Sequence, residues 1–81
     1  MRIKAVYYSD GWYTIVTTKK TGRVLGGETY EALVLSKGGN DGEWDEVMPS
    51  TRLGKRVAIT ALPKNIKNTI DLIKEMKECQ L

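Results

Sequence analysis

The chain has 81 residues, 41% of them hydrophobic and 28% charged, which is typical of one small folded domain over residues 1–81 and unlike a disordered tail. Thirteen basic against ten acidic residues give a net charge of +3, which permits an anionic partner without requiring one. The one cysteine, Cys79, cannot form a disulfide within the chain, and no segment has the pattern of a membrane span or a secretory leader, so we expect a cytoplasmic protein.

The first predicted elements are two strands joined by a tight turn. Arg2–Tyr8 and Trp12–Thr18 both alternate between two faces, and the Asp10-Gly11 pair between them is typical of a two-residue hairpin turn. A second turn is predicted at Lys20-Thr21-Gly22. It would lead into a short third strand, Arg23–Leu25.

The next segment, Tyr30–Lys37, has two interpretations. Tyr30, Leu33 and Val34 fall at helical spacing, and Gly38 follows as a helix stop. Leu33-Val34-Leu35 could equally be a buried strand. The helical spacing favours a short helix, and both interpretations stay open for residues 28–36.

The second half of the chain begins with a polar loop over residues 37–42. An acidic strand, Glu43–Met48, and a short strand, Lys55–Thr60, follow it, and Pro63 is placed to open a last helix, Lys64–Gln80. The predicted fold class is α+β, a small antiparallel sheet of four to five strands with this C-terminal amphipathic helix packed on one face. The buried stripe of the helix is expected to comprise Ile66, Ile70, Leu72, Ile73 and Met76.

Catalysis is not expected. The chain has no histidine, which removes the usual general base and most transition-metal sites, so we predict no enzyme activity, no cofactor and no metal. Acidic residues gather only at Asp41, Glu43, Asp45 and Glu46. A calcium ion is conceivable there, but the spacing differs from that of an EF-hand loop and favours a solvated acidic edge.

Basic residues form two short clusters near predicted turns: Lys19, Lys20 and Arg23, and then Arg52, Lys55 and Arg56. Cations at turns are commonly just solvated. If the two turns fall at the same end of the sheet, the clusters would offer five or six phosphate contacts, with neighbouring Trp and Tyr side chains as stacking surfaces. A basic β-sheet module that binds DNA or RNA is therefore the alternative function.

The segment Asp10–Leu33 resembles HicB-type antitoxins. In that family an Asp-Gly hairpin with aromatic residues leads through a third strand to a helix that starts with a Gly-Asp/Glu-Thr-x-Glu-Glu-Ala-Leu motif. The matching residues are Asp10, Gly11, Tyr13, Gly22, Val24, Gly27, Glu28, Thr29, Glu31, Ala32 and Leu33. Asp41-Gly42-Glu43 and Met48-Pro49-Ser50 extend the resemblance, which covers about residues 2–50.

The resemblance implies a non-catalytic protein that binds a small ribonuclease toxin and blocks its RNA site. Many members add a DNA-binding part. The groove-facing positions of such a part would here be Val57, Ile59 and Ala61, which cannot read bases, so DNA recognition is not expected from it.

The leading functional hypothesis is therefore a small binding or regulatory protein that inhibits a protein partner. Either the short strand Arg23–Leu25 or the acidic strand Glu43–Met48 could dock by edge pairing. Glu43, Asp45 and Glu46 are the predicted partner-binding residues, since a row of carboxylates suits a basic, RNA-binding partner. A homodimer is also compatible with the sequence.

Overall fold

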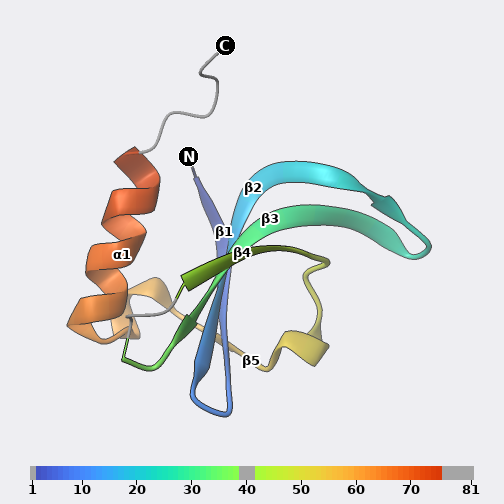
Figure 1. Ribbon diagram of the computed structural model, residues 1–81. Helices are drawn as coiled ribbons and strands as arrows, with labels where there is room; N and C mark the ends of the chain where they lie inside the picture. The colour runs from blue at the N-terminus through green and yellow to red at the C-terminus, as the bar shows by residue number, and fades with distance from the viewer. Residues whose placement is uncertain (1, 39–41, 76–81) are drawn as a thin grey trace.

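The computed structural model describes residues 2–38 and 42–75, except for the side chain of Thr51. Its five strands form one antiparallel sheet in the order β4-β3-β2-β1-β5, and a single helix, α1 (Lys64–Glu75), follows them (Figure 1). The predicted α+β class and the strand count are confirmed.

The first hairpin forms as predicted. β1 (Ile3–Ser9) pairs with the start of β2 (Trp12–Val24), and Ser9 lies opposite Trp12. Only Asp10 and Gly11 remain for the turn, with φ values of 47° and 84°. Two successive residues at positive φ are what a tight turn between right-twisted strands requires, and an Asp-Gly pair supplies them at little cost.

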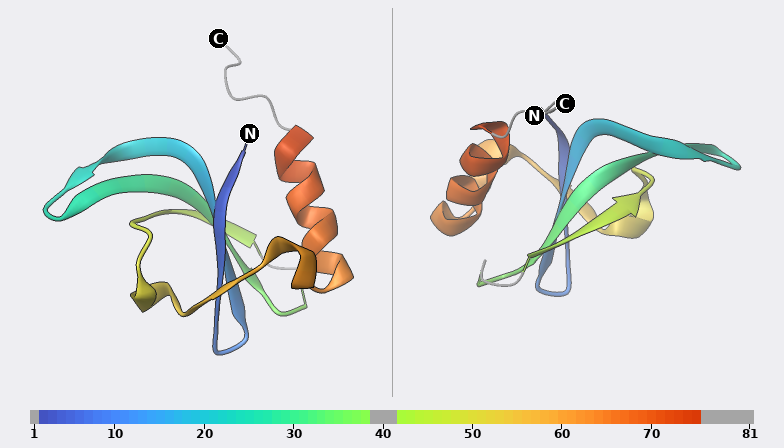
Figure 2. Two further views of the ribbon diagram at one scale, coloured as in Figure 1. Left: turned by 180° about the vertical axis from the view of Figure 1, so that it is seen from behind. Right: turned by 45° about the horizontal axis from the view of Figure 1, so that its top comes forward.

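The predicted second turn is wrong. β2 runs through Lys20-Thr21-Gly22 to Val24, so Arg23 belongs to β2 and not to a separate third strand. The pairing with β3 (Gly27–Ser36) shifts register on either side of Lys20, as β-bulges do, and Figure 2 shows the hairpin curving away from α1. The turn is made instead at Leu25-Gly26, where Gly26 has a φ of 99°.

Residues 28–36 form a strand, so the favoured short helix is wrong and its alternative is right. β3 lies between β2 and β4 (Gly42–Val47), and the run from Ala32 to Leu35 is largely buried. A strand with neighbours on both sides and cover on both faces reads as a continuous apolar run, which also fits a helical period over a few residues.

The chain next crosses from one edge of the sheet to the other. β4 pairs with β3, the 3-10 turn η1 (Thr51–Leu53) follows, and β5 (Lys55–Val57) pairs with β1 at the opposite edge (Figure 2). Gly54 makes this return possible. Its φ is 108°, and a Cβ there would collide with the backbone carbonyl of Tyr8.

β5 is shorter than the predicted strand Lys55–Thr60. It ends at Val57, and Ile59–Ala61 form a second 3-10 turn, η2. Leu62 then enters the core and Pro63 precedes α1. The Asn65 side chain donates to the carbonyls of Lys37 and Gly38, which ties the start of α1 to the end of β3.

Three isoleucines of α1 are buried, as the stripe predicted: Ile66, Ile70 and Ile73. They belong to one hydrophobic cluster with strand residues that include Val6, Ile15, Leu33 and Leu35. Leu72 was wrongly placed on the stripe and is 65% exposed, because its position points away from the three isoleucines. Met76 and the predicted last turn to Gln80 lie outside the described residues, as do Asp41 and Cys79.

Candidate functional site

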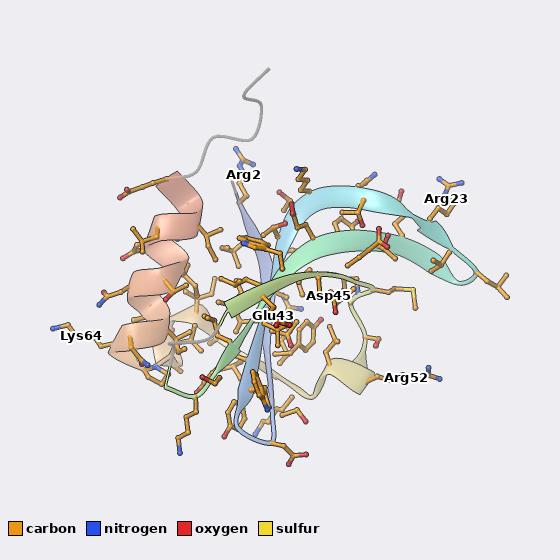
Figure 3. The ribbon with its side chains drawn as sticks, viewed as in Figure 1. Arg2, Arg23, Glu43, Asp45, Arg52 and Lys64 are labelled. Carbon is orange, nitrogen blue, oxygen red and sulfur yellow. The ribbon has the colours of Figure 1, made fainter. Side chains whose placement is uncertain are left out.

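The predicted partner-binding residues lie on an outer strand of the sheet. Glu43, Asp45 and Glu46 belong to β4, which has β3 on one side and ends the strand order on the other. All three are exposed, and we call β4 with these side chains the acidic edge. Glu43 pairs with Val34 and Asp45 with Ala32, so these two carboxylates share a face of the sheet (Figure 3), while Glu46, opposite Glu31, belongs to the other.

The carboxylates of the acidic edge are not neutralised within the described residues. The ion pairs there involve Glu28 and Glu31, and none involves β4. The Asp45 carboxylate accepts a hydrogen bond of 2.7 Å from the Glu46 backbone N–H. Glu43 makes no such contact. The edge thus presents a row of negative charge to solvent.

Trp44 is a residue of this edge that sequence reasoning did not single out. It lies opposite Leu33 of the hydrophobic cluster, yet 41% of it is exposed. Its position in an alternating strand could have indicated this exposure, because an outer strand of a sheet leaves one side of a large ring uncovered. It adds apolar surface to the face of β4 that also carries Glu46, opposite to the face of Glu43 and Asp45.

The first basic cluster is largely occupied by ion pairs across the β2–β3 hairpin. Lys19 Nζ lies 3.4 Å from a Glu31 carboxylate oxygen, and Lys20 Nζ lies 3.2 Å from a Glu28 oxygen. Arg23 approaches the same Glu28 oxygen at 3.9 Å. The hydrogen bond from Lys20, its charge, and smaller contributions from Tyr30 and Arg23 hold the pKa of Glu28 below its usual value. These cations serve the hairpin itself.

The second basic cluster is differently placed. Arg52 lies on η1, and Lys55 and Arg56 lie on β5; all three are exposed, and none has an ion pair within residues 2–38 and 42–75. Figure 3 shows Arg23 near the tip of the hairpin and Arg52 below it, both on the side away from α1. Arg23 and Arg52 thus share a side of the molecule, but the two clusters share neither a strand nor a turn.

The aromatic residues expected to stack on bases are mostly used in packing. Tyr13 is buried in the cluster, Tyr8 packs against it, and their ring centroids are 4.7 Å apart. Near the first turn, Trp12 is 48% exposed and Tyr7 is partly buried. These rings form no extended stacking surface within residues 2–38 and 42–75.

A basic groove, which sequence reasoning missed, lies beside β1. β5 pairs only with Val6–Tyr8, so the outer side of Ile3–Ala5 has no neighbouring strand. An open groove of about 560 Å³ occupies this place, and two further hollows that share Ile59 with it continue towards α1. Lys4 and Arg56 are the charged residues of the groove itself. The two further hollows add Arg2, Lys67, Lys74 and one carboxylate, Asp71.

The groove arises because β5 ends at Val57, and the sequence pattern does not reveal where this strand ends. A fifth strand reaching Thr60, as predicted, would have run alongside more of β1 and filled it. The signal that could have revealed it is the spread of cations over three separate elements, Arg2 and Lys4 on the first strand, Arg56 on the last, and Lys67 and Lys74 on the helix.

Within the described residues, no three Cys, Asp or Glu side chains are grouped closely enough to hold a metal ion. No helix among these residues has both the length and the apolar character to cross a membrane. A scan of the chain against models of known families, a search of curated proteins and a search of solved structures each give no match.

Proposed function

We propose that the protein is a non-enzymatic binding protein whose acidic edge captures a basic segment of a partner protein. The observation that carries this proposal is an outer strand with three exposed carboxylates and a part-exposed tryptophan. None of the three carboxylates forms an ion pair within the described residues. The lack of any histidine supports a role other than catalysis.

Edge pairing is the mechanism that this arrangement favours. An outer strand has backbone N–H and C=O groups on its open side, and an extended segment can use them to add a strand to the sheet. Glu43 and Glu46 would meet cations on either face of the added strand, and Trp44 would lose exposed apolar area. Charge would set the rate of encounter and the choice of partner, while backbone pairing would hold the complex.

The partner we favour is a small basic ribonuclease, in line with the sequence resemblance to HicB-type antitoxins. The motif that starts a helix in that family, Gly27–Leu33 here, lies in strand β3, so the resemblance supports the class of partner and not the fold. An acidic strand placed over a cationic RNA site would exclude RNA and so inhibit the enzyme. We propose that α1 packs across one face of the sheet and leaves β4 open for this contact. Such an inhibitor would act in the cytoplasm, with its partner encoded beside it.

Affinity capture from the native host, with sequencing of the neighbouring genes, tests the proposal. The wild-type protein should retain a basic protein, Glu43→Lys should weaken the capture, and Glu43→Lys with Glu46→Lys should abolish it. Glu75→Lys, an equal charge reversal on the exposed end of α1, is the matched control and should capture as the wild type does. A basic partner held equally well by the double variant would disprove the edge mechanism; the absence of any partner would disprove the function.

Nucleic-acid binding remains the second candidate, and one observation favours it. Arg52, Lys55 and Arg56 are exposed without acidic partners in the described chain, whereas Lys19, Lys20 and Arg23 are paired. Anisotropy of labelled single-stranded RNA and duplex DNA at low salt would test it. Arg52→Glu with Arg56→Glu should remove binding, and Lys20→Glu should change it less. No binding of either probe would exclude this candidate.

A further inference from the structure

The two outer strands of the sheet carry opposite charges. β4 has three carboxylates and no basic residue over Gly42–Val47. At the other edge, β5 consists of Lys55, Arg56 and Val57, and the basic groove continues beyond it along β1. In one copy of the chain these edges cannot meet, because β3, β2 and β1 lie between them.

The basic groove has the form of a vacant strand position. Ile3 and Ala5 pair with β2 on one side, with a register shift at Lys4 between them, and the outer side of these residues has no strand to pair with. Lys4, Ala5 and Val6 line one side of the groove, and the segment from Arg56 to Thr60, which leaves β1 after Val57, lines the other. An extended segment with carboxylates along it has the complementary shape and charge.

From these observations we infer that the basic groove binds the acidic edge of a second copy of this chain. The inference shares β4 with the proposed function but requires no foreign partner. Glu43 and Asp45 of the incoming strand share a face and would meet Arg56 and Lys4, which also share one. Lys4 Nζ lies 4.8 Å from the centroid of the Tyr30 ring on that face. Trp44, 41% exposed, and Ile59, 36% exposed, would become covered by the same contact. A nucleic-acid strand could offer charge to the groove, but it lacks the backbone N–H groups and the tryptophan that an added β-strand brings.

The contact is head-to-tail, because the two surfaces are different. Each copy that docks its acidic edge leaves its own groove open for the next copy, so association leads to a ring or to an open chain and not to a closed two-fold dimer. A partner protein that binds the acidic edge would then compete with self-association, and binding of the partner would disperse the oligomer.

Sedimentation velocity of the pure protein at low salt, over a range of concentrations, tests the inference. The weight-average mass should rise with concentration to at least double that of the monomer and should fall again as salt is added. Two variants remove one side of the contact each: the edge variant, Glu43→Lys with Asp45→Lys, and the groove variant, Lys4→Glu with Arg56→Glu. Each alone should stay monomeric.

Mixing these two variants gives the decisive result. The reversed edge of one matches the reversed groove of the other, and the unreversed pair of surfaces also matches, so an equimolar mixture should regain the mass of the wild type. Misfolding of a variant cannot produce this recovery, and circular dichroism of each variant checks its fold. Lys37→Glu with Lys64→Glu, which reverses two exposed lysines outside the groove, should associate as the wild type does.

Three results would overturn the inference: a wild-type protein that stays monomeric at every concentration, variants that still associate, or a mixture that does not recover. A monomeric wild type that still captures a basic protein would leave the proposed function standing and remove only self-association. A monomeric wild type whose groove variant loses affinity for RNA or DNA would assign the groove to nucleic acid instead.

Discussion

β2 is one continuous strand with two unlike halves. From Tyr13 to Thr17 every residue is buried, and from Thr18 to Val24 every residue is exposed. The first half packs in the centre of the sheet, with Ile15 in the hydrophobic cluster and Val16 fully buried on the opposite face. The second half is held to β3 by ion pairs and by a 2.9 Å hydrogen bond between Thr21 and Thr29.

The two halves are therefore stabilised by different forces. Burial of an aliphatic side chain contributes about 1.5–3 kcal/mol, whereas an exposed ion pair contributes about 0–1 kcal/mol. Substitutions around the buried half should consequently decide whether the chain folds, and those in the exposed half should change only local order. The acidic edge and the basic groove lie outside the buried half, which leaves them open to change without loss of the fold.

The largest effect is expected in the cluster that the buried half shares with α1. Ile70→Ala should lower the free energy of unfolding by about 2–5 kcal/mol, because Ile70 is 1% exposed and the cavity left behind adds to the lost burial. Leu72→Ala, two residues away and 65% exposed, should cost less than about 0.5 kcal/mol. Urea unfolding followed by circular dichroism measures both. Equal losses in the two variants would mean that α1 does not contribute its isoleucine face to the core.

Glycine substitutions should separate backbone strain from steric collision. Gly26 turns the exposed hairpin at a φ of 99° with nothing near its missing Cβ, so Gly26→Ala should cost about 1–2 kcal/mol from the left-handed conformation alone. Gly54→Ala meets a similar φ of 108° and also the carbonyl of Tyr8, so its loss should be larger. Thermal unfolding of both variants tests the order. If Gly26→Ala lowered the melting temperature more than Gly54→Ala, the backbone of Gly54 could not lie as close to Tyr8 of β1 as described.

Thr17 marks the boundary between the two halves. It is fully buried, and its hydroxyl donates a 2.6 Å hydrogen bond to the backbone carbonyl of Glu31. Thr17→Val keeps the shape but leaves that carbonyl without the donor, which should cost about 1–3 kcal/mol. Thr18→Val, at the next position and exposed, is the control and should be nearly neutral. Chemical denaturation gives both values; a neutral Thr17→Val would show that the carbonyl has another donor.

The same division explains which parts of the fold could be predicted. The buried half and its Asp10-Gly11 turn follow local rules, as do the acidic strand and the isoleucine face of α1. The exposed half does not: Gly22 resembles a turn residue but pairs with Thr29, and nothing local distinguishes the helical from the strand interpretation of Tyr30–Leu35. Those outcomes depend on neighbouring strands far away in the sequence.

The candidate site divides in a similar way. The acidic edge could be found from the sequence, since three carboxylates in one short strand suit an outer position in a sheet. The basic groove could not, because it depends on β5 ending at Val57 and on η2 and α1 returning beside β1. Cations from three elements gather there only in the folded chain.

The smallest effect concerns pH and the exposed half of β2. Lys20 lowers the pKa of Glu28, so the folded state holds this carboxylate charged at a pH where the unfolded chain begins to bind a proton. The stability from this pair is therefore present above the ordinary pKa of 4.5 and is lost as the pH falls through the lower folded value. Glu28→Gln should remove that part of the acid sensitivity and change little at neutral pH, because the Lys20 side chain is 62% exposed and that of Glu28 34%, so that solvent screens the pair. Melting temperatures of the wild type and the variant between neutral and acid pH measure the difference.

Glu75→Gln, on α1 and outside the ion pairs of the hairpin, should keep the acid sensitivity of the wild type. A Glu28→Gln protein with an unchanged pH profile would mean that Lys20 and Glu28 do not stay paired in solution, and that the exposed half of β2 is held by its backbone hydrogen bonds alone.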